Sequence, residues 1–190
     1  MFSTSHLAVS GASAQVHWDA GAEAGVTKRF TAGGEGAPAP GLGPSLELTG
    51  HVALLPMVRL GVYLGSDLSP AAPDGLRSFW DGGLHLRLSP PLVPWPWRTW
   101  LATGFGYAFA DNLGSHAPGG MLEVPVGLGV GRKVSRHAML FVELGGRVGF
   151  GFYGRMYDRA ATETAGETPG AYVGKDTFAL SLSVGLSLEE

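Results

Sequence analysis

Side chains able to act as a nucleophile, a base or an acid come closest together near the middle of the chain. Ser115 and His116 are adjacent in the segment Asp-Asn-Leu-Gly-Ser-His, and Glu123 follows a few residues later. Nucleophilic catalysis requires a base held within hydrogen-bond distance of the nucleophile, and a third group that orients the base. A Ser–His neighbour pair in a loop has no spacing that sets this geometry. We therefore predict no catalytic residues and expect that the protein is not an enzyme.

Other chemistry-bearing patterns are equally weak. The 6 histidines show no i, i+2 or i, i+4 pairing of the kind that metal sites use, and the chain has no cysteine. The glycines of Gly127–Gly131 imitate a nucleotide-binding motif, but they lie inside a strand-like pattern that no helix follows. The sequence predicts neither a metal site nor a cofactor.

Charged residues occur instead within alternating segments, and the last segment shows the pattern most clearly. In Thr177–Glu190, Phe178, Leu180, Leu182, Val184, Leu186 and Leu188 share one parity, while the other parity holds small or polar residues. A period of two is typical of a β-strand with one apolar and one polar face. The remaining question is whether the apolar face points inward, as in a soluble lipocalin-like barrel, or outward into lipid.

The same alternation predicts eight strands. Each apolar stretch has about 9 to 11 residues, which is the length that a tilted strand needs to cross a hydrocarbon core. The predicted strands are Gln15–Phe30, Ser45–Leu54, Met57–Gly65, Phe79–Leu88, Thr99–Phe109, Met121–Gly131, Ala138–Phe152 and Thr177–Leu188.

The connections between these strands alternate in length. Shorter ones join strands two and three, four and five, and six and seven, whereas the other four are longer and rich in Gly, Pro, Ala and Asp. An even number of strands with turns at one end and loops at the other is typical of outer-membrane barrels. The predicted fold class is all-β, an eight-stranded antiparallel up-and-down transmembrane β-barrel.

Composition and aromatic placement favour an outward apolar face. Only 15% of the residues are charged, against about 25–35% for a designed soluble surface. The opposite face is rich in glycine and alanine, which suit the crowded interior of a small barrel. Aromatic residues gather near strand ends, where rings favour the lipid head groups. The predicted aromatic girdle consists of Trp18, Trp80, Trp95, Trp97, Trp100, Phe150, Phe152, Tyr153 and Phe178.

The inward parity carries charges of both signs. Uncompensated charge in a lumen is costly, so we predict that these groups neutralise one another and plug the barrel; a gated polar path or proton relay is the alternative. We also expect Glu123 to face Arg147 across strands six and seven. The predicted ion-pair network consists of Glu23, Arg29, Glu47, Arg59, Asp81, Arg87, Glu123, Glu143 and Arg147, with Asp19, His17, His51, His85 and Tyr63 on the same face.

Strand number, loop rhythm and the pattern of Thr177–Leu188 resemble the small outer-membrane β-barrels of the OmpA/OmpX kind from Gram-negative bacteria. The resemblance covers about Gln15 to Leu188 and implies a location in the bacterial outer membrane, with lipid as the surrounding partner. Such barrels usually end in Phe or Trp, whereas this chain ends in Leu188-Glu189-Glu190. It also lacks the His-x-Ser-Asn pattern of the barrels that deacylate lipid A, so a lipid-modifying hydrolase at the outer rim is kept only as an alternative to a protein without enzymatic activity.

These patterns predict one barrel domain, residues 15–190, after an N-terminal lead, residues 1–14. Ala12-Ser13-Ala14 fits a signal-peptidase site, and a plain N-terminal lead is the alternative. A net charge of −3 excludes an electrostatic case for nucleic acid. We expect a structural, adhesive or envelope-complex role, with Thr31–Pro44 and Tyr153–Asp176 as the loops that contact a protein partner. A narrow pore for small or apolar solutes and a soluble binding barrel are the alternatives.

Overall fold

The computed structural model of the chain describes residues 16–31, 41–71, 75–112, 119–154 and 177–190. The predicted N-terminal lead, the Ser115–His116 pair and most of the two predicted partner loops lie outside these residues. No helix among the described residues is long and apolar enough to cross a membrane.

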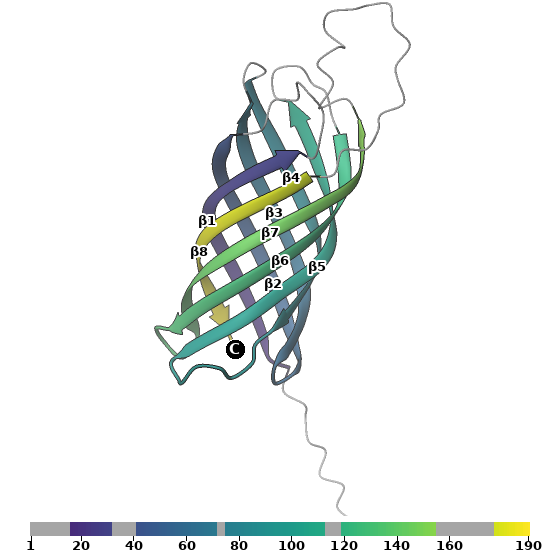
Figure 1. Cartoon of the computed structure of the whole chain (residues 1–190). Helices are drawn as coiled ribbons and strands as arrows, with labels where there is room; N and C mark the ends of the chain where they lie inside the picture. Colours follow the sequence, from purple (N-terminus) through teal and green to yellow (C-terminus); the bar gives the residue numbers. More distant parts are fainter. Residues whose placement is uncertain (1–15, 32–40, 72–74, 113–118, 155–176) are drawn as a thin grey trace, which may run out of the picture.

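Eight antiparallel strands form one closed barrel in chain order (Figure 1). Each strand pairs with its neighbours in the sequence, and β1 also pairs with β8 from Asp19 opposite Glu189 to Thr31 opposite Thr177. The predicted fold class is confirmed. The strands are β1 (Trp18–Thr31), β2 (Leu42–Leu55), β3 (Val58–Ala71), β4 (Gly75–Leu88), β5 (Trp97–Asn112), β6 (Gly119–Lys133), β7 (Ala138–Gly154) and β8 (Thr177–Glu189).

Several strands extend beyond their predicted ends. β3 runs to Ala71, whereas the alternation of apolar residues predicted its end at Gly65. β4 begins at Gly75, whereas its predicted start was Phe79. The added residues pair in register, with Asp67 opposite Phe79 and Ser69 opposite Arg77. Hydrogen bonding between strands continues past the apolar band because it involves the backbone, which the hydrophobic pattern does not report.

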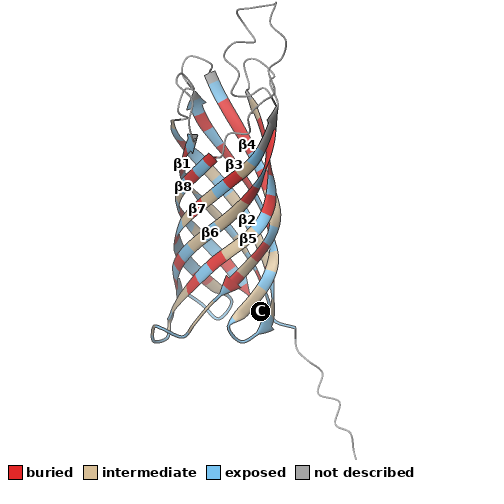
Figure 2. Cartoon of the chain, turned by 45° about the vertical axis from the view of Figure 1, so that its right-hand side comes forward, coloured by how far each residue is buried: buried red, intermediate tan, exposed pale blue. Residues whose placement is uncertain are grey.

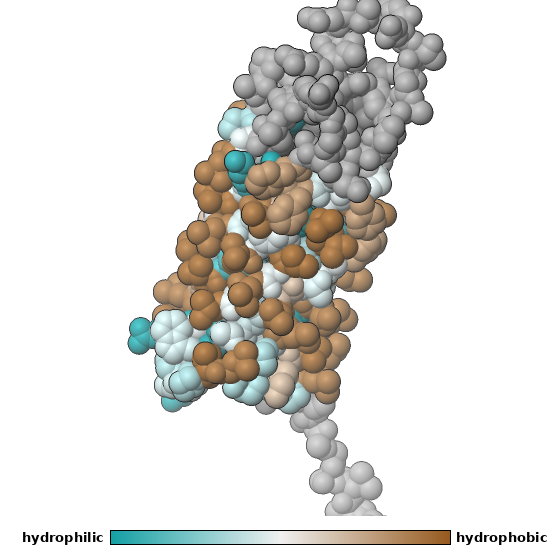
Figure 3. Space-filling model, viewed as in Figure 1, coloured by the Kyte–Doolittle hydropathy of each residue, from teal (hydrophilic) through white to brown (hydrophobic). Residues whose placement is uncertain are grey.

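The apolar parity of every strand points away from the barrel axis. In β8, Leu182 and Val184 are 52% and 61% exposed, whereas Ser183 between them is 5% exposed. Figure 2 shows this alternation of burial along the strands. Figure 3 shows apolar side chains spread over the strands of the visible face. An apolar surface of this extent requires a hydrocarbon environment, so the inward-facing alternative of a soluble cup is wrong.

The connections β1–β2, β3–β4, β5–β6 and β7–β8 leave one end of the barrel, the loop end (Figure 1). The connections β2–β3, β4–β5 and β6–β7 lie at the other end, the turn end, where β1 starts and β8 stops. The predicted alternation of lengths holds only in part, because residues 72–74 alone join the extended strands β3 and β4, whereas residues 89–96 join β4 and β5. The Val134 amide donates to the Ala138 carbonyl at 3.0 Å in the β6–β7 turn. In outer-membrane barrels the loop end faces the cell exterior.

Candidate functional site in the barrel lumen

Arg29 on β1 occupies the loop-end part of the lumen and is completely buried. Its Nη2 donates to Asp67 Oδ2 on β3 at 2.8 Å, and its Nη1 donates to Glu123 Oε1 on β6 at 3.2 Å. The guanidinium also lies over the Phe79 ring of β4, 4.0 Å from its centroid. One side chain thus joins four strands across the lumen.

Arg147 on β7 has the same arrangement at the next level. It donates to Glu47 on β2 and to Asp81 on β4, and its guanidinium lies 6.0 Å from the Tyr63 ring centroid. A 4.0 Å contact between Arg29 Nη2 and Asp81 Oδ2 connects the two levels. Both arginines therefore belong to one continuous set of ion pairs.

Asp19 on β1 contacts several basic side chains nearer the turn end of the lumen. It accepts a hydrogen bond from Arg59 on β3, contacts His51 Nδ1 on β2 at 2.9 Å and lies 3.7 Å from Arg87 Nη1 on β4. The second ring nitrogen of His51 lies 2.9 Å from His85 Nδ1. Asp19, His51 and His85 form a short hydrogen-bonded chain inside the barrel.

Glu143 on β7 is held by an indole. Trp100 Nε1 on β5 donates to Glu143 Oε2 at 2.6 Å, and Arg87 lies 4.8 Å from the Trp100 ring centroid. The ring fits because Gly129 faces it, since a Cβ at Gly129 would overlap the indole. Glu23 lines an interior cavity of about 10 Å³ together with Arg147. This cavity has room for about one water molecule.

All nine residues of the predicted network face the lumen. Seven of them form the ion pairs described above, Glu143 pairs with an indole, and Glu23 faces the small cavity. His17 is the exception among the other inward predictions, because it is exposed at the turn end, where its ring contacts the Glu190 carbonyl.

The predicted facing of Glu123 and Arg147 is wrong. Glu123 lies opposite Gly149, and Arg147 lies opposite Pro125. Direct facing of Glu123 and Arg147 requires a hairpin centred on Ser135, whereas the observed register centres it on Arg136. A shift of one residue at the turn moves every cross-strand pair by two residues. Arg147 meets acids from across the lumen instead.

Asp67 and Trp100 take part in the lumen contacts described above but were not predicted as members of the network. Asp67 lies on the extension of β3 beyond Gly65, and Trp100 was assigned to the aromatic girdle. That assignment of Trp100 is wrong, since its side chain is only 2% exposed. Parity would have placed it correctly, because Leu101 and Phe105 of the same strand face outward and Trp100 has the opposite parity.

The remaining girdle residues are distributed as follows. Trp18 and Trp97 are exposed near the turn end, Trp95 lies in the connection before β5, and Phe178 is exposed near the loop end. Trp80 is exposed on β4 and Phe150 is half-buried on β7. The side chains of Phe152 and Tyr153 lie outside the described residues.

A smaller group of ion pairs lies at the turn end of the barrel. Glu189, the last residue of β8, accepts a hydrogen bond from Arg98 at 2.8 Å, and its Oε2 lies 2.7 Å from Lys133 Nζ. These partners come from β5 and β6, so the three strands are joined at this rim. Trp18 Nε1 donates to Glu190 beside them.

Comparisons with known proteins agree with this architecture. Neisserial surface protein A has a similar crystal structure, with a TM-score of 0.66 and 15% identity over 90% of this chain and 96% of that chain. The outer membrane protein OprG from Pseudomonas aeruginosa matches with a TM-score of 0.56 and 10% identity over 92% and 95%. The chain has the fold of the small outer-membrane β-barrels. The predicted resemblance is confirmed.

At these identities the similarity concerns the fold. No protein-family model and no curated protein sequence matches the chain. The outer-membrane fold and the outward apolar face agree with each other, so the prediction of a bacterial outer-membrane barrel is confirmed in both fold and lipid-facing surface. The role of that barrel has to be inferred from its own side chains.

Proposed function

We propose that this outer-membrane barrel is a closed scaffold, with a structural, adhesive or envelope-complex role, and that it does not conduct ions. The observation that supports this proposal most directly is a pair of arginines that cross the lumen, of which Arg29 is completely buried and Arg147 has a 13% exposed side chain. Arg29 joins β1, β3 and β6, while Arg147 joins β7, β2 and β4. Six of the eight strands are therefore tied together by ion pairs that cross the lumen.

The chemistry of these contacts supports a plug. Eight strands leave an interior that is only wide enough for side chains. Arg29, Glu123 and Asp81 have fully buried side chains, so solvent does not reach them. A hydrated ion would have to break charge-assisted hydrogen bonds in order to pass.

The outer surface would then hold the scaffold in place. Exposed rings such as Trp18, Trp97 and Phe178 occupy strand ends, where aromatic side chains favour lipid head groups. We infer that Thr31–Pro44 and Tyr153–Asp176 contact a protein partner at the cell exterior. Tyrosine and arginine, which the second loop contains, are the residue types that most often anchor protein contacts.

Conductance in planar lipid bilayers tests the closed lumen. The folded protein should give no steady current in concentrated salt, with heat-modifiable gel migration showing that the inserted protein is folded. A double variant, Arg29→Ala with Arg147→Ala, removes both cross-lumen ties and should give measurable current if it keeps that migration. A steady current from the unaltered protein would instead support the narrow pore.

The loop role requires a separate experiment. Replacing residues 156–175 by a short Gly–Ser linker should leave a heat-modifiable barrel, because β7 and β8 end outside the replaced segment. Cell adhesion, or co-purification of envelope proteins after cross-linking, should be lost. Full retention of both by the folded variant would contradict a partner at this loop.

A further inference from the structure

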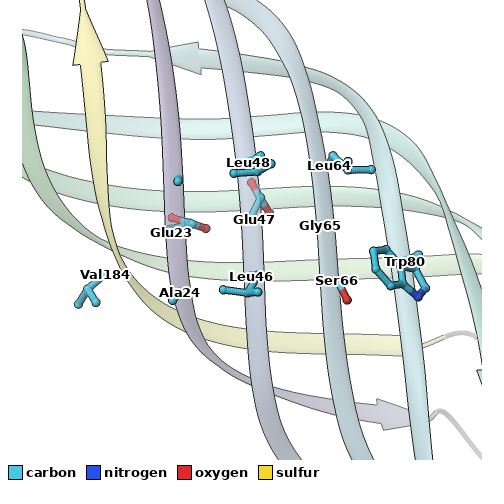
Figure 4. A pocket seen from close by; sticks show the side chains of 11 residues that line it. Glu23, Ala24, Leu46, Glu47, Leu48, Leu64, Gly65, Ser66, Trp80 and Val184 are labelled. Atoms are coloured by element: carbon cyan, nitrogen blue, oxygen red, sulfur yellow. The ribbon is translucent and has the colours of Figure 1, made fainter. Parts of the chain in front are cut away.

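A groove lies on the lipid-facing surface of β1 to β4, with β8 at its edge, and has a volume of about 500 Å³ (Figure 4). Ala22 and Ala24 of β1 line it, and longer side chains stand on both sides. Ala24 lies opposite Leu46 on β2 and Val184 on β8, and Ala22 lies opposite Leu48. The groove is therefore a depression over two short side chains between taller rows.

The side chains around the groove stand well out from the wall. Leu46 is 64% exposed and Val184 is 61% exposed. Beyond the Leu46 row, the lining continues over the small side chain of Ser66 on β3 to Trp80 on β4. The exposed atoms of the groove are almost all apolar, so its natural occupant is a hydrocarbon chain.

Above the groove, β1 carries a cation. Lys28 has the same outward parity as Ala24 and lies four residues closer to the loop end, or about 13 Å along the strand. Its Nζ lies 5.4 Å from the Phe30 ring centroid, and Phe30 stacks on Phe178 with centroids 6.2 Å apart. Exposed rings at a strand end favour the head-group region, so the ammonium lies at that level.

Lys28 is distinctive in its place and its partners. Among the described residues, the exposed lysines and arginines are Lys28, Arg132 and Arg136, and only Lys28 lies at the loop end. No described carboxylate forms an ion pair with it, whereas Lys133 and Arg98 pair with Glu189. Its charge remains available to an anion at the depth of the head groups.

We propose that this groove and Lys28 form a binding site for a lipid of the outer leaflet whose phosphate-bearing head group carries a net negative charge. The acyl chain would lie over Ala24 and Ala22 between the rows of β2 and β8, and the head-group phosphate would meet the Lys28 ammonium. The hydrocarbon core is about 30 Å thick, so one leaflet spans about 15 Å. The separation of about 13 Å between Lys28 and Ala24 fits within that leaflet. The site does not depend on whether the lumen conducts.

Native mass spectrometry of the full chain in detergent tests this site. Phosphatidic acid and phosphatidylcholine with identical acyl chains serve as probes. The unaltered protein should retain phosphatidic acid about fivefold better, the ratio expected for one surface cation near anionic head groups. Lys28→Gln should bring the two lipids to parity. Arg132→Gln, which removes an exposed cation at the turn end, should keep the preference.

A second variant tests the groove itself. Ala24→Leu adds bulk to the groove and leaves Lys28 in place, so retention of both lipids should fall, whereas Val130→Leu on β6 should leave retention unchanged. Heat-modifiable migration checks that each variant is folded. Equal retention of both lipids by the unaltered protein would overturn the proposal. The proposal would also be overturned if the preference for phosphatidic acid survived Lys28→Gln or if inorganic phosphate displaced the lipid. A protein dimer that Ala24→Leu dissociates would show that a second copy of the chain occupies the groove, which would overturn it as well.

Discussion

At the scale of single residues, the lumen depends on a few arginines that each have several partners. Arg147 has two carboxylates on different strands, and Arg29 also has two. Opposite charges at hydrogen-bond distance stabilise one another strongly where water is excluded. Removing the shared cation leaves two acids close together without compensation, which costs more than the loss of one contact.

We therefore expect Arg147→Ala to lower the free energy of unfolding by about 3–5 kcal/mol, the cost of breaking a buried pair. Urea unfolding in lipid vesicles, followed by tryptophan fluorescence, measures this change. Arg136→Ala, in the exposed β6–β7 turn, is the matched control and should change stability by less than about 1 kcal/mol. Equal effects of the two substitutions would show that the Arg147 ion pairs do not stabilise the barrel.

The opposite placements of Trp80 and Trp100 lead to a second prediction. Lipids with brominated acyl chains quench rings that touch the hydrocarbon. Trp80 is 56% exposed on the outer surface, and Trp100 is 2% exposed beside Glu143. Trp80→Phe should reduce the quenchable part of the fluorescence, whereas Trp100→Phe should leave it unchanged. A loss of quenching on Trp100→Phe would place that ring in the girdle after all.

At the scale of the strands, the two faces of the sheet meet different environments. Outward positions meet hydrocarbon, and inward positions meet charged side chains from other strands. Alternation in the sequence predicted which residues share a face, and the low charge together with the small residues of the other parity indicated which face meets lipid. It did not predict the strand ends, because beyond the apolar band residues such as Asp67 and Ser69 carry no hydrophobic signal.

A charge on the outward face tests this arrangement. Leu128, near the middle of β6, is 56% exposed. Leu128→Arg should lower the free energy of unfolding in vesicles by about 2–4 kcal/mol, the cost of an arginine near the bilayer midplane. Val134→Arg, in the turn beyond β6, should cost at most about 1 kcal/mol. An unfolding free energy unaffected by Leu128→Arg would mean that this face meets water.

At the scale of the whole molecule, closure decides the behaviour. Pairing of β1 with β8 leaves no free sheet edge, so every strand has backbone partners on both sides. A closed sheet satisfies its backbone polar groups internally, which a strand structure must do in hydrocarbon. Closure also creates the lumen, in which residues far apart in the sequence become neighbours.

Extraction of the protein from expressing cells tests the properties of the whole barrel. We expect recovery in detergent and not in plain buffer, and slower or faster gel migration of unheated than of boiled samples, because the closed barrel resists detergent until it is heated. Recovery of a folded monomer in buffer would contradict the lipid-facing surface. Boiling-independent migration would contradict a closed barrel that resists unfolding.

The sequence by itself determined the number of strands, their order, the parity of their faces and the environment of the barrel. These properties follow from local alternation and from the lengths of connections, which are read along the chain. The partners of the inward charges were decided only by the tertiary structure. Arg29 meets Glu123 from a strand 94 positions away, and Arg147 meets Glu47 across 100 positions. Such pairs depend on the register of the hairpins and on closure of the sheet. A shift of one residue at one turn changes the register, and with it the side chains that meet in the lumen.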